Sequence, residues 1–274
     1  MGGVIVPEVA VDLWKVVNAD RLTPDLIISL LKGEVGAVRI QNFLSEEACN
    51  KCLEAIKNNG VDYYEGVYPK IGKVGITQFE HRFSAEKKKE YFAKAKQANH
   101  VRESIFQASN DPVKEVVEAV QEGWEHPVTF AVEKGTNEQY FAGLIRVMNR
   151  ALLHVDWAGG LDGLFPEWSI GEINAQLAWN IYLQPSNSGG STIVYRRLWR
   201  KSDETFYKLQ DSYAYSEEVV ADSDFVRIIP QQGELVFFNP QHYHEVQMTE
   251  GDTDRITVSS FIGLMPDQRL VFWS

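Results

Sequence analysis

A series of short strand-like segments in the second half of the 274-residue chain limits the folds open to it. Each segment either alternates apolar and polar residues or is rich in β-branched and aromatic residues, and turn-forming residues separate many of them. Many short strands divided by turns are typical of a sandwich or a barrel. The expected strands are Gly143–Met148, Ala151–Val155, Ala175–Leu183, Ser191–Leu198, Val226–Ile229, Glu234–Phe238, Tyr243–Met248 and Arg255–Leu264.

The first third of the chain is predicted to be mixed, with more helix than strand. Several segments carry an N-cap residue or an early proline followed by good helix formers. Because we find no internal repeat and no linker, residues 1–274 are expected to form a single domain. The predicted fold is mainly β with α, in which a helical N-terminal layer (about 1–130) packs on a jelly-roll core (about 131–274). The expected helices are Thr23–Lys32, Ser45–Asn59, Ser84–Gln97 and Asp111–Glu122, and Val35–Phe43 is an expected strand.

The two cysteines, Cys49 and Cys52, have C-x-x-C spacing, which is shared by redox and zinc motifs. Together with Leu53 and Ile56 they form an apolar stripe at helical spacing. No second pair of Cys or His lies at zinc-finger spacing. We therefore expect reduced thiols packed in the core.

Charge and hydropathy exclude several classes of protein. The net charge of −11 would repel a phosphate backbone, so no nucleic-acid partner is expected. No apolar run is long enough to span a membrane. The N-terminus lacks the features of a secretory signal, and Val6 stands where a myristoylation motif needs Ser or Thr. These features and the reduced thiols predict a cytoplasmic protein. The sequence does not indicate an oligomeric state.

The triplet His154-Val155-Asp156 is the strongest functional signal. On a strand, positions 154 and 156 project to the same face, so an imidazole and a carboxylate converge. A second histidine would complete the facial triad of non-haem Fe(II) oxygenases, which leaves three coordination positions open. His242 and His244 are both candidates and share the same parity. We favour His244, because His242 lies closer to the turn at Asn239-Pro240.

A candidate site for a carboxylate follows eleven residues after His244. Arg255 and Thr257 share a strand face, and a guanidinium with a nearby hydroxyl suits the distal carboxylate of 2-oxoglutarate. Arg146, on the strand that leads to the triad, is an alternative partner for a co-substrate carboxylate.

Three further residues are candidates for contact with the substrate. His81 lies in a segment that alternates polar and aromatic residues, and Trp157 opens the Gly- and aromatic-rich stretch Trp157–Trp168, whose composition suits a lid. Trp179 lies on an expected strand, where it would line the pocket or belong to the core.

In these patterns the chain resembles the Fe(II)/2-oxoglutarate dioxygenase superfamily, whose core is a double-stranded β-helix. More narrowly, it resembles the standalone group of carrier-independent alkaloid halogenases and N-substituted amino-acid hydroxylases. Apart from the triad, the segments that carry the resemblance are Ile76–His81, Gly189-Gly190 before Val194-Tyr195, Gly233–Asn239, Tyr243–Val246, Arg255–Thr257 and Phe272–Ser274.

The resemblance implies Fe(II), 2-oxoglutarate and O2 as cofactor and co-substrates, and a small-molecule substrate. The halogenases of this group have Gly where this chain has Asp156, so the resemblance implies hydroxylation, or a related oxidation such as desaturation, in place of halogenation. The expected substrate is a natural-product intermediate, or alternatively a free or N-substituted amino acid. Two other classes remain open: a cupin-like metalloenzyme that does not use O2, and a jelly-roll binding module.

Overall fold

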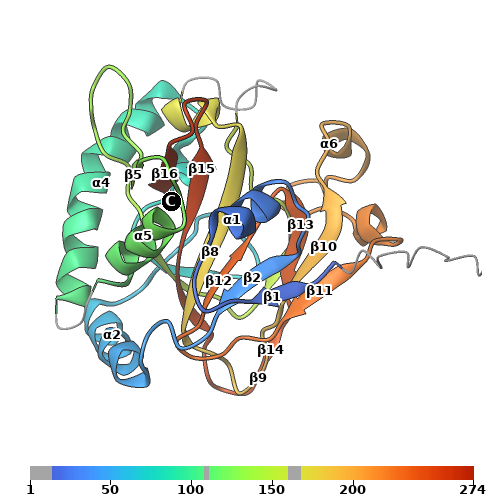
Figure 1. Cartoon of the computed structure of the whole chain (residues 1–274), viewed down its shortest axis with the longest axis horizontal. Coiled ribbons are helices and arrows are strands. Elements are labelled where there is room, and N and C mark those ends of the chain that lie inside the picture. The colour runs from blue at the N-terminus through green and yellow to red at the C-terminus, as the bar shows by residue number, and fades with distance from the viewer. Residues whose placement is uncertain (1–13, 108–110, 160–167) are drawn as a thin grey trace, which may run out of the picture.

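The larger of two main sheets forms the centre of the computed structural model, which describes residues 14–107, 111–159 and 168–274 (Figure 1). It has ten strands in the order β1-β2-β12-β8-β15-β6-β4-β3, with β16 paired to β15 and β5 paired to β16. The strands are β1 (Val16–Asn18), β2 (Ala37–Ile40), β3 (Asp62–Tyr63), β4 (Gly72–Val74), β5 (Val128–Phe130), β6 (Leu144–Val147), β8 (Ala175–Gln184), β12 (Leu235–Phe238), β15 (Ile256–Leu264) and β16 (Leu270–Trp273).

The smaller sheet has four antiparallel strands in the order β11-β10-β13-β7. They are β7 (Ala151–His154), β10 (Thr192–Leu198), β11 (Phe225–Ile228) and β13 (His242–Val246), and a ribbon of β9 (Ser188–Gly189) and β14 (Thr249–Glu250) lies apart from them. Side chains of both sheets meet in one apolar cluster, which includes Ala178 and Phe238 from the larger sheet and Val194 and Ile228 from the smaller. The two sheets therefore form the expected jelly roll.

The four longest helices cover the outer face of the larger sheet (Figure 1). Their N-cap residues Thr23, Ser45, Ser84 and Asp111 each accept a backbone N–H, as the capping signals predict. The helices are α1 (Pro24–Leu31), α2 (Glu46–Asn59), α4 (Ala85–Phe106) and α5 (Pro112–Glu122); α3 (Gln78–His81), α6 (Asp203–Phe206), η1 (Ser169–Glu172) and η2 (Glu217–Val220) are single turns.

The N-terminal third contributes more strand than the sequence indicates. Five of the strands of the larger sheet, β1 to β5, lie before residue 131, so this region is partly built into the sheet as well as packed on it. The short strands β3, β4 and β5 have only two or three residues each, too few for a period-two pattern to stand out. The expected division into a helical layer and a β core is therefore less sharp than predicted.

Neither cysteine is in a disulfide, and both are buried on the inner side of α2, as expected. Burial, followed by the neighbouring Cys52, raises the pKa of Cys49 to about 11, so this thiol stays protonated at neutral pH. Cys49 and Cys52 are therefore packing residues of the main apolar core.

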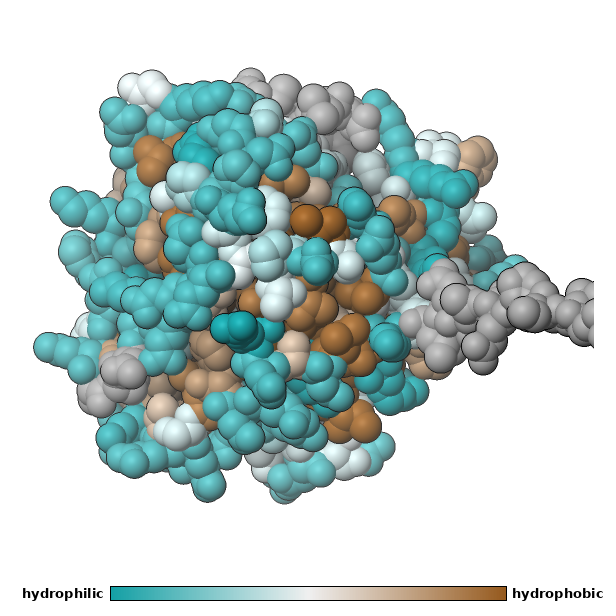
Figure 2. All heavy atoms as spheres, viewed as in Figure 1, coloured by the Kyte–Doolittle hydropathy of each residue, from teal (hydrophilic) through white to brown (hydrophobic). Residues whose placement is uncertain are grey.

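Hydrophilic residues cover most of the face seen in Figure 2, with apolar residues gathered in its middle. In the three described ranges, no helix combines the length and apolar character that crossing a bilayer requires.

Candidate metal centre

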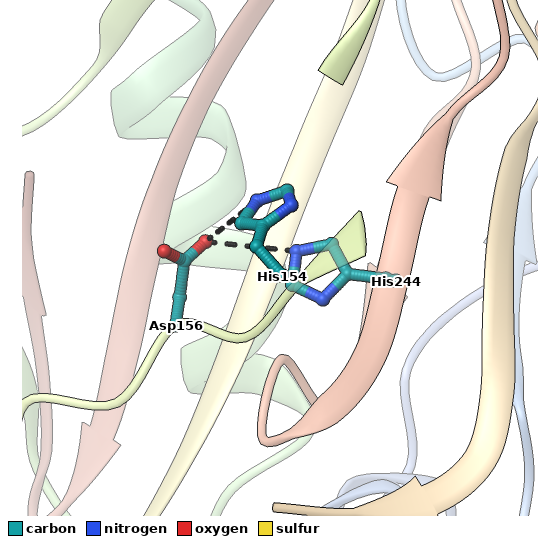
Figure 3. A group of neighbouring side chains, drawn as sticks. All are labelled: His154, Asp156 and His244. Carbon is teal, nitrogen blue, oxygen red and sulfur yellow. Dashed lines mark ion pairs between the residues drawn. The ribbon is translucent and has the colours of Figure 1, made fainter. Parts of the chain in front are cut away.

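His154 and His244 lie opposite each other in the smaller sheet. They are register partners of β7 and β13, and their ring centroids are 4.2 Å apart. Asp156 lies just beyond the end of β7, where its backbone N–H donates to the Pro240 carbonyl at 2.9 Å. Its Oδ2 lies 3.8 Å from His154 Nε2 and 3.6 Å from His244 Nε2. Figure 3 shows the three side chains pointing toward one another, with one ligand atom from each within 4.8 Å of the others.

Backbone carbonyls orient both imidazoles. Nδ1 of His154 lies 2.6 Å from the Leu152 carbonyl oxygen, and Nδ1 of His244 lies 2.9 Å from the His242 carbonyl oxygen. When Nδ1 carries the proton for these bonds, the lone pair of each ring is on Nε2, the atom that faces Asp156. This is the arrangement that outer hydrogen bonds impose on histidine ligands of metals.

The charge states also suit a divalent metal. Burial, followed by the charge of His244, lowers the pKa of His154 to about 4, so this ring is neutral at pH 7. Burial would raise the pKa of Asp156, but the neighbouring His244 and His154 outweigh it and hold the pKa below its usual value. At neutral pH His154 therefore offers a neutral nitrogen and Asp156 an anionic carboxylate. With His244 they make up the two-histidine, one-carboxylate set of non-haem iron sites.

His242 does not join this group, although it has the same parity as His244. The pairing of β10 with β13 shifts between Val194 and Leu198. The His242 ring packs 4.8 Å from the ring of Trp14, and its Nδ1 lies 3.0 Å from the Tyr195 carbonyl oxygen. In the described part of the chain, the group of possible metal ligands comprises His154, Asp156 and His244.

Arg255 is fixed by its neighbours before any ligand binds. It lies directly before β15 and is 2% exposed. Its Nε donates to the Gly190 carbonyl oxygen at 3.1 Å, its Nη2 donates to Thr192 Oγ1 at 3.2 Å, and its guanidinium lies 4.9 Å from the Tyr182 ring centre. A guanidinium held in one orientation can bind a carboxylate without a further loss of rotamer freedom.

One cavity connects Arg255 with the three possible metal ligands. Thr257 and Trp179 also line it, and both Thr257 Oγ1 and Trp179 Nε1 are buried without a hydrogen-bond partner among the described residues. A buried polar atom without a partner is costly, so these atoms favour a polar ligand in the cavity. In this cavity the cation of Arg255 and the unpaired hydroxyl of Thr257 suit the distal carboxylate of 2-oxoglutarate. The possible metal site suits its oxoacid end.

Arg146 lies between this cavity and a second one. On β6 it pairs in register with Thr257, and it lines both cavities. Burial would lower its pKa, but interactions with Tyr64 and Asp156 raise it. Its charge therefore acts on Asp156 and Tyr64, and its role toward a co-substrate stays a prediction.

A second cavity is also lined by His154 and Asp156. Its walls include Trp157 and Phe261 and, from the segment around α3, Gln78, Phe79 and Arg82. It is larger than the cavity that contains Arg255, and it is open to a substrate.

His81 is not among the residues that line either cavity, so the structure gives no support to the predicted substrate contact of this residue. Its Nδ1 lies 2.8 Å from the Thr77 carbonyl oxygen, and its ring packs edge-on against Tyr91. Residues Gln78–His81, in the segment that alternates polar and aromatic residues, form a helical turn. Gln78 and Arg82, on either side of His81 in this segment, line the second cavity instead.

Residues 15–274 match the family model described as the carrier-protein-independent halogenase WelO5. The chain belongs to this family. The chain is 38% identical over 227 residues to the leucinostatins biosynthesis cluster protein S of Purpureocillium lilacinum, a match that covers 78% of this chain and 90% of the relative. It is 26% identical over 268 residues to the L-gamma-glutamyl-L-propargylglycine hydroxylase of Streptantibioticus cattleyicolor, covering 94% of this chain and 95% of the relative.

A solved structure has the same fold as this WelO5-family chain. It is an N-substituted L-amino acid dioxygenase from Burkholderia ambifaria in complex with alpha-KG, with a TM-score of 0.62 at 14% identity over 92% of this chain and 91% of the other. The chain is thus a Fe(II)- and 2-oxoglutarate-dependent oxygenase with a double-stranded β-helix core, and the resemblance seen in the sequence is confirmed.

Some residues of the site in this WelO5-family enzyme carry no motif of their own. Gln78, Arg82 and Tyr213 line the cavities but come from separate segments with no spacing that links them. Thr192 carried only a weak sequence signal, because it lies between Gly189-Gly190 and Val194-Tyr195, which carry part of the family resemblance. Of the predicted lid Trp157–Trp168, residues 160–167 lie outside the described residues, while Trp157 lines the second cavity as expected and Trp168 packs against Tyr91.

Proposed function

We propose that this WelO5-family enzyme is a hydroxylase that acts on an unactivated C–H bond of a small molecule. The observation that carries the proposal is the carboxylate of Asp156, which lies beside both His154 and His244. With three protein ligands, a metal retains three positions, two for 2-oxoglutarate and one for O2. The halogenases of this family have Gly in place of Asp156, which leaves a further position open for a halide.

The residues of the chain have distinct parts in this proposal. His154, Asp156 and His244 would hold Fe(II), which with 2-oxoglutarate and O2 supplies the oxidising power to break the C–H bond. Arg255 and Thr257 would bind the distal carboxylate of 2-oxoglutarate by charge-assisted hydrogen bonds. The apolar walls of the second cavity would hold the substrate beside the metal.

The substrate we propose is a natural-product intermediate, with a free or N-substituted amino acid as the alternative. Support comes from the relatives: one is named for a biosynthesis cluster, and another is a hydroxylase of a γ-glutamyl amino acid that matches over nearly the whole chain. The second cavity, with aromatic and aliphatic walls, suits a largely apolar molecule of this kind.

The proposed metal site can be tested by anaerobic titration of Fe(II) and 2-oxoglutarate, followed through the weak visible charge-transfer band of the chelate. The wild-type chain should develop the band, and His154→Ala and His244→Ala should lose it because each removes a ligand. His242→Gln is the matched control and should keep it, since His242 packs against Trp14 away from the group. A band that survives in His154→Ala, or is lost in His242→Gln, would contradict the assignment.

The type of reaction needs its own measurement. With chloride present, mass spectrometry of the product should detect addition of oxygen, or loss of two hydrogens if desaturation occurs, and no chlorine. Chlorinated product from the wild-type chain would favour halogenation, the activity in the family description. Product without consumption of 2-oxoglutarate would instead favour a metalloenzyme that does not use O2.

A further inference from the structure

We infer that Gln78 and Arg82, at the two ends of α3, form a recognition site for an acceptor head group of the substrate, a carboxylate or an amide carbonyl. The inference rests on the proposed function in one respect: it takes the second cavity to be the substrate chamber. His154 and Asp156 line this same cavity, so a molecule held at α3 presents its remaining atoms to the metal site.

Gln78 supplies a hydrogen-bond donor that the protein leaves unused. The residue is 6% exposed and lines the cavity, and its Nε2 is buried without a hydrogen-bond partner in the described part of the chain. Its backbone N–H donates to the Ser274 carbonyl oxygen at 3.0 Å, which holds the start of the turn in place. A buried amide without a partner has lost its hydrogen bonds to water without compensation, and an acceptor oxygen from a ligand would restore one of them.

Arg82 adds a positive charge one turn later. Its guanidinium lies 4.0 Å from the Phe79 ring centre and lines both the substrate cavity and the open space that adjoins it. Burial lowers its pKa to about 10, against the charges of Asp156 and Glu204, so it stays protonated at neutral pH. The stacking on Phe79 limits the orientations of the guanidinium, and a planar fork so held suits a carboxylate or a carbonyl.

Two other polar groups that line the chamber have partners within the protein. Oε1 of Gln176 accepts the Ala158 N–H at 3.0 Å, and Thr77 Oγ1 donates to Glu80 at 2.8 Å. At α3 the chamber therefore presents the amide donor of Gln78 and the cation of Arg82. These groups favour an acceptor oxygen over an amine.

The rest of the chamber is apolar beside the metal site. Ile71, Met148 and Ala151 form one buried cluster, and all three line the cavity together with Phe261. The inferred substrate thus combines an oxygen head group on Gln78 and Arg82 with an aliphatic chain whose C–H bonds lie along this wall.

The test uses three probes with the same alkyl chain: 4-methylpentanoate, 4-methylpentanamide and 4-methylpentan-1-amine. Binding to the metal-free full chain is measured by calorimetry and by tryptophan fluorescence, because Trp157 and Trp273 line the cavity. The acid and the amide should bind at least tenfold more tightly than the amine. Gln78→Leu and Arg82→Met should each weaken binding of the acid by roughly tenfold or more, as expected for loss of a hydrogen bond to a charged group.

Matched controls separate recognition from folding. Gln97→Leu and Arg21→Met change exposed residues of the same types outside the cavity and should leave the affinity unchanged. Arg82→Lys keeps the charge and should restore part of the affinity for the acid. Equal binding of the amine and the acid, absence of binding by both acceptor probes, or wild-type affinity in both cavity variants would overturn the inference.

Failure of the inference is distinguishable from failure of the proposed function. Wild-type affinity in the variants together with an intact charge-transfer band would overturn the head-group site alone. Probe binding that is sensitive to Gln78 and Arg82 in a chain that forms no band would overturn the hydroxylase alone.

Discussion

Arg255 is positioned for a carboxylate by hydrogen bonds to the Gly190 carbonyl oxygen and to Thr192 Oγ1. We expect Arg255→Met to raise the apparent KM for 2-oxoglutarate by roughly 10- to 100-fold, the range for a lost charge-assisted hydrogen bond, with a smaller effect on kcat. Succinate formation at varied 2-oxoglutarate measures both constants.

Arg146→Met is the comparison for this prediction, because Arg146 lines the same cavity from β6. Its KM for 2-oxoglutarate should change less than that of Arg255→Met. An unchanged KM in Arg255→Met with a raised KM in Arg146→Met would move the carboxylate contact to Arg146.

Single residues were predictable from sequence where extended backbone places two groups, two positions apart, on one side. His154 with Asp156, and Arg255 with Thr257, are such pairs. In each pair one residue lies on a strand and the other lies just outside it, and all four line one cavity. The choice of His244 over His242 was not accessible from parity, because it depends on which of the two lies opposite His154 in the pairing of β13 with β7. Gln78 and Arg82 were missed since their contribution depends on a helical turn that local alternation concealed.

At the scale of elements, the connection between β10 and β11 supports the strand that carries His154. Within it, Tyr215 donates its backbone N–H to the Leu153 carbonyl at 2.9 Å, and Tyr213 Oη accepts the Leu152 N–H at 2.8 Å. The Leu152 carbonyl in turn accepts the proton of His154 Nδ1. β7 is an edge strand of the smaller sheet, and the connection hydrogen-bonds to the edge of β7 that faces away from β13.

Tyr213→Phe should therefore affect both stability and metal binding. Loss of the acceptor for the Leu152 N–H should lower the free energy of unfolding by about 1–2 kcal/mol. A looser β7 should also weaken Fe(II) binding severalfold, measured by anaerobic titration, while chemical denaturation reports stability. Tyr207→Phe, in the same connection but with no hydroxyl partner in the described residues, should change neither. Equal metal affinity in Tyr213→Phe and the wild-type chain would contradict a positioning role.

Elements with strong local signals were largely predictable. The capped helices and the long strands β8, β10 and β15 lie where sequence patterns indicate, although α4 continues to Phe106, well beyond the expected end at Gln97. Its partly buried second half is held by packing, including Ile105 and Phe106 in the main core, which local composition does not reveal. The short strands β3 to β5 depend on partners elsewhere in the chain for the same reason.

At the scale of the whole molecule, N-terminal strands are integrated into the C-terminal jelly roll. β2 pairs with β12, and β5 pairs with β16, so residues separated by more than a hundred positions share one sheet. We therefore predict a single cooperative unfolding transition for the chain. Far-ultraviolet circular dichroism and tryptophan fluorescence should give the same midpoint in denaturant. Two separate midpoints would contradict a single domain and favour an N-terminal unit that unfolds on its own.

The position of Asp156 has a consequence for how such enzymes can diverge. The residue lies outside the ladder of β7, and the contact that fixes its backbone is an N–H to the Pro240 carbonyl, which any residue except proline can make. Replacing its side chain therefore removes a metal ligand while leaving the strand pairing of His154 and His244 intact. An ancestral chain could thus exchange one chemistry for another through one codon without first acquiring compensating changes in its fold.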